Sequence, residues 1–108
     1  MRSIGLSTDP RKARAHILAN IPLGTRLDTA EKQLQRMGFE CRIAESRVFE
    51  DQASAENGRV RFTDIDYFVC HTERSVLFTG HRAWVVALVF DPDRTVTNVL
   101  VQVFKVTL

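Results

Sequence analysis

The residues of this chain best suited to chemistry are three histidines and two cysteines: His16, His71, His81, Cys41 and Cys70. The histidines fall in different segments and the cysteine spacing matches no zinc motif, so we expect no metal site and no cofactor. His71 lies near Glu73 in the sequence, and both His71 and His81 could meet Asp64 or Asp66 in space. A cluster of such groups can transfer protons. No spacing in the sequence demands such a cluster, so we assign no catalytic residue.

Recognisable catalytic motifs are missing from the sequence. It contains no GxSxG nucleophile elbow, no phosphate-binding P-loop and no GxGxxG dinucleotide fingerprint. Asp91 and Asp93 flank a proline in a pattern typical of a turn, and the calcium-loop pattern is absent. The sequence favours a non-enzymatic protein. The alternative is a small enzyme or ligand-binding domain that uses His71, His81 and nearby acidic residues.

Cys41 and Cys70 leave two interpretations open. Unpaired cysteines are commonly buried and behave as small apolar residues, and this interpretation is favoured. The alternative is a disulfide that joins two adjacent strands, which would imply an oxidising compartment. Titration of the thiols in the denatured, unreduced protein distinguishes the two.

Length and charge limit the classes of protein. A chain of 108 residues suffices for one domain, so we expect a single domain over residues 1–108, with residues 1–8 flexible. A net charge of +2 is too small to indicate nucleic-acid binding. No apolar run is long enough to span a membrane, and no secretory signal is visible. We expect a cytoplasmic protein if the chain is complete, and a cell-envelope protein if an export signal has been removed.

Two helices are predicted near the N-terminus. Asp9 and Pro10 form a helix start, and Pro22 ends this first helix. The second helix is expected to begin at Asp28, in a capping box with Glu31, or at Thr25. Gly38 suits the residue that follows a helix, with Phe39 folding back onto Leu34.

The remaining residues predict strands. Residues 39–49 resemble an edge strand, residues 51–58 a loop, and residues 60–70 a strand region broken near Asp64. Residues 71–79 are expected to form a connection. The most regular strands are residues 82–90 and 96–106, joined by a turn at residues 91–94. We therefore predict an α+β fold: two N-terminal helices packed on one face of a three- or four-stranded antiparallel sheet.

Both faces of the predicted hairpin are apolar, whereas two short helices can cover only one face of a small sheet. Three explanations are open: a curved sheet that wraps the second face, a homo-oligomer interface, or a groove for a protein or lipid-like ligand. Either the row of residues 84–90 or the second row of valines must meet the helices. The candidate binding face comprises Val85, Val89, Val99, Val101 and Val103.

The order of elements, with the stretches "RMGFEC" and "AWVVALVFDPDRTVTNVLV", resembles the β-lactamase-inhibitor-protein-like fold, which small outer-membrane assembly lipoproteins share. The matching residues are Gly24-Thr25, Gly38-Phe39, Trp84, Phe90-Asp91 and Val96. The chain departs from that pattern in lacking a lipidation cysteine and in carrying Asp93-Arg94 where a glycine is common. The resemblance implies a non-enzymatic domain that binds protein through its sheet. We expect a protein-binding or self-associating module, with a protein partner or a homo-oligomer and no nucleic acid.

Overall fold

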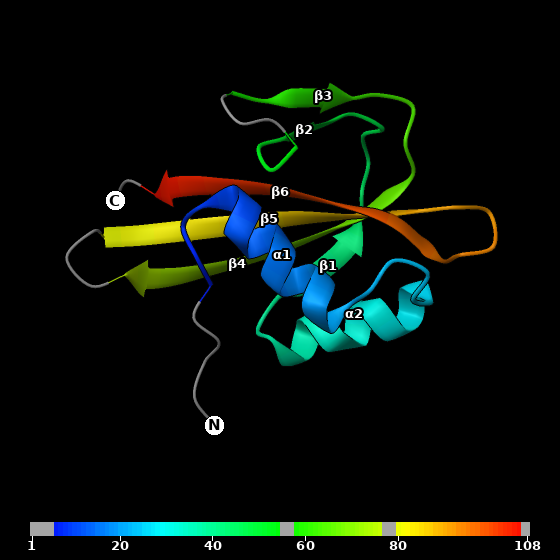
Figure 1. Cartoon of the computed structure of the whole chain (residues 1–108), viewed down its shortest axis with the longest axis horizontal. Coiled ribbons are helices and arrows are strands. Elements are labelled where there is room, and N and C mark those ends of the chain that lie inside the picture. Colours follow the sequence, from blue (N-terminus) through cyan, green and yellow to red (C-terminus); the bar gives the residue numbers. More distant parts are fainter. Residues whose placement is uncertain (1–5, 55–57, 77–79, 107–108) are drawn as a thin grey trace.

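The computed structural model describes residues 6–54, 58–76 and 80–106, so most of the segment expected to be flexible, residues 1–8, lies outside it. Two helices precede the strands, as predicted, and the fold is α+β with antiparallel sheets (Figure 1). The elements are α1 (Pro10–Asn20), α2 (Leu27–Arg36), β1 (Glu40–Ile43), β2 (Phe49–Asp51), β3 (Val60–Phe62), β4 (Tyr67–Val76), β5 (Gly80–Phe90) and β6 (Val96–Val106).

The start of α1 is the one predicted. The side chain of Asp9 accepts a hydrogen bond from the main-chain N–H of Arg11 at 3.0 Å, and Pro10 occupies the first helical position. The buried residues Ala13 and Ile17 lie on the face that meets the sheet.

The start of α2 differs from the prediction. The helix begins at Leu27, and Asp28 lies in its first turn rather than at the cap. The reason is tertiary: the N–H of Leu27 donates to the carbonyl of Arg94 at 2.9 Å, and Arg26 forms a β-bridge with Thr95. The C-terminus is as predicted, with Gly38 at φ +96° and the N–H of Phe39 bonded to the carbonyl of Leu34.

The four-stranded sheet has the order β1-β4-β5-β6, and all its pairs are antiparallel. In Figure 1, α1 crosses in front of the long strands and α2 lies on the side of β1. The predicted connection at residues 71–79 is wrong up to Val76, because β4 continues through polar residues that pair with β5. Residues 77–79 lie outside the described part.

The turn at residues 91–94 has the predicted chemistry. The N–H of Arg94 donates to the carbonyl of Asp91 at 2.8 Å, and Arg94 has φ +60°. The carboxylate of Asp91 accepts from the N–H of Thr95 at 3.0 Å and from its hydroxyl at 2.9 Å. The main-chain bond first, and the hydroxyl next, lower the pKa of Asp91 below its ordinary value of 3.8.

The register of β5 and β6 corrects the candidate binding face. Val99, Val101 and Val103 stand opposite Leu88, Val86 and Trp84, so both rows share the face that meets the helices. Val99 and Val101 are fully buried there. Val85 and Val89 point to the other face, in contact with a second cluster. The five valines therefore do not form one surface. Side chains alternate along each strand, and the register places the odd-numbered residues of β6 on the same face as the even-numbered residues of β5.

The second apolar face is partly covered by a separate two-stranded sheet, β2–β3. Phe49 of β2 packs there with Tyr67, Ala87 and Leu100, and the rings of Phe49 and Tyr67 meet edge to face with centroids 5.5 Å apart. This cover corresponds to the first of the three predicted explanations, although a second sheet provides it instead of a curved continuation of the first.

Candidate functional site

The sheet face opposite the helices is the candidate surface, because β2–β3 covers only the end of it near Tyr67. The register assigns to this face the odd-numbered residues of β4 and β5 and their even-numbered partners on β1 and β6. Of the described residues on this face, we call those beyond the covered end the open face: Glu40, His71, Glu73, Ser75, His81, Ala83, Val85, Gln102, Phe104 and Val106. Val85 and Gln102 form its border, because Val85 packs against the covered cluster and Gln102 is hydrogen-bonded to β2.

Polarity divides the open face across its strands. The β5–β6 side is mainly apolar, and Phe104 is 36% exposed there. The β1–β4 side carries the carboxylates of Glu40 and Glu73, with Glu40 Oε1 lying 3.9 Å from His71 Nε2. The side chain of Glu40 is 86% exposed. An apolar strip thus borders an acidic margin, which is the distribution expected of a surface that docks a protein.

His71 and His81, which the alternative enzymatic function would use, share the open face but do not converge. His81 is paired with Ser75, which lies further along β4 than His71, so roughly 13 Å separates the two rows. Ser75 Oγ lies 3.3 Å from His81 Nδ1. Within residues 6–54, 58–76 and 80–106, no group of three histidine, cysteine or acidic side chains could hold a metal ion. Each histidine therefore has its own neighbours, and His16 lies apart on α1.

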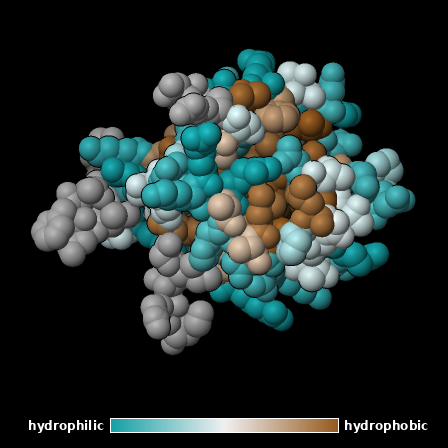
Figure 2. Space-filling model, in the orientation of Figure 1, coloured by the Kyte–Doolittle hydropathy of each residue, from teal (hydrophilic) through white to brown (hydrophobic). Residues whose placement is uncertain are grey.

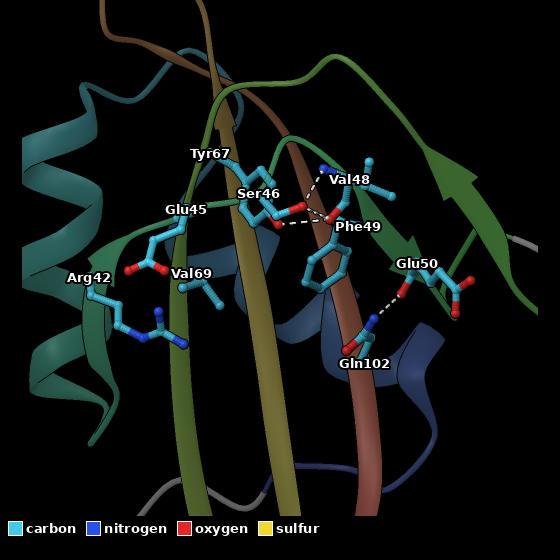
Figure 3. Close-up of a pocket in the computed structure, with 10 residues that line it drawn as sticks. Arg42, Glu45, Ser46, Val48, Phe49, Glu50, Tyr67, Val69 and Gln102 are labelled. Carbon is cyan, nitrogen blue, oxygen red and sulfur yellow. Dashed lines mark hydrogen bonds between the residues drawn. The ribbon is translucent and has the colours of Figure 1, made fainter.

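A groove of about 430 Å³ lies where the open face meets β2 (Figure 3). In Figure 3, Arg42 and Glu45 lie on one side of it, Phe49 and Gln102 on the other, and Val69 between them. The full lining comprises Arg42, Ala44, Glu45, Ser46, Val48, Phe49, Glu50, Tyr67, Val69 and Gln102.

Hydrogen bonds hold the β2 side of this groove in place. The hydroxyl of Tyr67 donates to the carbonyl of Val48 at 2.8 Å, and the amide of Gln102 donates to the carbonyl of Glu50 at 2.5 Å. Among the described residues, no hydrogen bond or ion pair engages the guanidinium of Arg42. The groove can therefore receive an apolar side chain beside a free cation.

Cys41 of β1 and Cys70 of β4 form a disulfide, which is the alternative that the sequence left open. Their Cα atoms are 4.0 Å apart in directly opposed positions of the two strands. Cys70 is fully buried in the core beneath the helices. The bond attaches the short strand β1 covalently to the long strand β4.

The β6 edge of the sheet is closed by groups from other elements. The carboxylate of Asp51 accepts from the N–H of Val101 at 2.6 Å and is also bonded to the hydroxyl of Ser54. Gln52 donates its N–H to the carbonyl of Val101 at 2.9 Å and accepts from the N–H of Val103 at 2.8 Å through its side chain. These groups occupy the positions that a further strand would use.

The β1 edge is open by comparison. The N–H of Ala44 donates to the carbonyl of Tyr67, so the even-numbered residues of β1 face β4. The main-chain groups of Cys41 and Ile43 consequently point away from the sheet. No group of the described residues bonds to them, and the side chain of Ile43 is 72% exposed.

The sequence does not predict the closure of β6, and it predicts a cover of the second face only as one of three explanations and as a curved continuation of the sheet. Asp51 and Gln52 stand in a segment with loop-like composition, and their partners lie about 50 residues away. The polar residues Gln102 and Lys105 interrupt the apolar run of β6 near Phe104. This interruption is the local sign in the sequence that the end of the strand is exposed.

Comparison with known proteins gives no assignment. No family model, no curated protein and no solved structure matches this chain. No helix within the described residues is long and apolar enough to cross a membrane.

Proposed function

We propose that this protein is a protein-binding module that acts through its antiparallel sheet, with the partner docked on the open face. The observation that carries the proposal is the exposed ring of Phe104, with the half-buried Ala83 and Val106 on the same face and an acidic margin beside them. Stable interfaces commonly have an apolar centre and a polar rim, and an aromatic residue at the centre often dominates the binding energy.

The groove beside β2 supports the same proposal. It continues the open face, since Gln102 belongs to the open face and also lines the groove. A partner lying across Val85 and Phe104 can insert one side chain between Val69 and Phe49. Such an anchor residue is a common feature of protein interfaces.

Two further considerations agree with this proposal. The resemblance to β-lactamase-inhibitor-protein-like domains implies binding through a sheet. The disulfide between Cys41 and Cys70 supports a site of action in an oxidising compartment, such as the cell envelope.

Replacement of Phe104 by arginine tests the docking surface. The tagged protein is purified from its native host under mild conditions, and co-purifying proteins are identified by mass spectrometry and then combined with the purified chain. We expect Phe104→Arg to weaken the reconstituted binding by about tenfold or more, because a charge would enter the apolar centre of the interface.

Leu23→Arg is the matched control. Leu23 is 53% exposed in the loop between the helices, outside the open face. Figure 2 shows the helix side of the molecule, where hydrophobic areas in the centre, beside α1, and at the top, where β2 and β3 lie, stand among mainly hydrophilic side chains. Equal loss of binding in both variants, or no loss with Phe104→Arg, would contradict docking on the open face.

A further inference from the structure

We propose that the β1 edge binds a second copy of this chain, so that two β1 strands pair antiparallel and one sheet continues through both copies. Glu40 and Arg42 of this edge also border the open face and its groove. The contact itself runs through the main chain of β1, whereas Phe104, which tests the docking surface, belongs to the opposite edge strand β6, so that either proposal can fail while the other stands. The proposal rests on the free main-chain groups of β1 and on the order of charges along the strand.

The main chain of β1 can accept another strand. Cys41 and Ile43 direct their N–H and C=O groups outward, and three of the four side chains of the strand are exposed. The disulfide to Cys70 holds the strand in its extended form before any partner arrives. The edge is therefore ordered in advance, which lowers the entropic cost of association.

The charges of β1 select the second copy as its occupant. Consider two antiparallel β1 strands in which Cys41 of one copy stands opposite Cys41 of the other, which we call the register centred on Cys41. Glu40 of each copy then stands opposite Arg42 of the other copy. Both side chains belong to the same sheet face, and the two-fold axis keeps the helices of both copies on the other face. One symmetric contact thus creates two ion pairs.

Other registers of the same contact are less favourable. A pair centred on Arg42 would place two guanidinium groups opposite each other, which is destabilising. In that register the outward main-chain groups of Cys41 and Ile43 would bond to each other, so the charges, and not the main chain, distinguish the two registers. The register centred on Cys41 is therefore the one that satisfies the charges.

Charge reversal provides the test. Sedimentation velocity of the oxidised full-length chain, from about 10 µM to about 1 mM, is compared for the unaltered protein, Glu40→Arg, Arg42→Glu and the double variant. We expect the unaltered chain to dimerise and each single variant to dissociate about tenfold more readily, since like charges then face each other. The double variant restores opposite charges at both positions and should dimerise like the unaltered chain.

Glu45→Arg serves as the control for net charge. Glu45 is exposed and follows β1, outside the paired residues, so this variant should dimerise like the unaltered chain. Raising the salt concentration from about 50 to about 500 mM should weaken the dimer, because exposed ion pairs are screened. A monomer throughout the concentration range, single variants that dimerise normally, or a double variant that stays monomeric would each overturn the proposal.

Discussion

The two edges of the four-stranded sheet are treated differently by this fold. At the β6 edge, Asp51 and Gln52 satisfy the outward main-chain groups of Val101 and part of those of Val103. At the β1 edge, the outward groups of Cys41 and Ile43 have no partner among the described residues. Edge strands with free main-chain groups can pair with other chains, and proteins usually protect them.

The two edges also differ in the interactions that keep each edge strand in place. Closing β6 requires a fully buried aspartate, Asp51, whose carboxylate must be satisfied by hydrogen bonds. Leaving β1 open requires a short strand that stays in place without a neighbour on its outer side. The disulfide supplies that attachment. One edge is thus protected by noncovalent contacts, and the other is fixed covalently and left accessible.

The largest expected effect comes from removing the disulfide. The double variant Cys41→Ala, Cys70→Ala should lose about 3.5 kcal/mol of stability in urea unfolding, because the bond closes a loop between residues 29 positions apart. Reductant should lower the urea concentration at which half of the unaltered protein is unfolded, toward the value of the double variant. Two thiols that react with iodoacetamide in the denatured, unreduced protein would contradict the bond itself.

A smaller effect is expected at the closed edge. Asp51→Ala should cost about 2 kcal/mol, because the buried N–H of Val101 loses its acceptor. Asp51→Asn keeps an oxygen in that position and should cost less. Hydrogen exchange of the Val101 amide gives the local measurement, and equal losses in the two variants would show that the bond to Val101 does not account for the effect.

The smallest effect is expected in the turn where β6 begins. The lowered pKa of Asp91 means that its carboxylate stabilises the fold above pH 3.8, and that this contribution disappears as the pH falls through the lower folded value. The stability difference between the unaltered protein and Asp91→Asn should therefore narrow below pH 3.8. Asp93→Asn is the control, since Thr95 bonds to the carboxylate of Asp91. A difference that stays constant with pH would contradict this role.

The elements predicted correctly from the sequence depend on local features. Asp9 and Pro10 start α1 by chemistry within a few residues, and the apolar runs of β5 and β6 surround a turn whose residues are suited to it. The two caps predicted for α2, Thr25 and Asp28, lie on either side of the observed cap Arg26, because the start of the helix depends on Arg94 and Thr95, which are distant in the sequence.

The elements that were missed depend on pairing across the chain. Residues 72–75 are mostly polar, so they predict a connection, yet the register with β5 keeps them extended in β4. The candidate face failed for a related reason. Side-chain alternation assigns Val99, Val101 and Val103 to one row, but only the register shows that this row joins Trp84, Val86 and Leu88 beneath the helices.

The disulfide between Cys41 and Cys70 also affects how the sheet responds to force. When an edge strand is peeled from a sheet, its hydrogen bonds break one after another, so a strand of four residues offers little resistance. A pull on β1 passes instead through a covalent bond into β4, which pairs with β5 along its entire length. The shortest strand of the main sheet can therefore transmit tension to its centre.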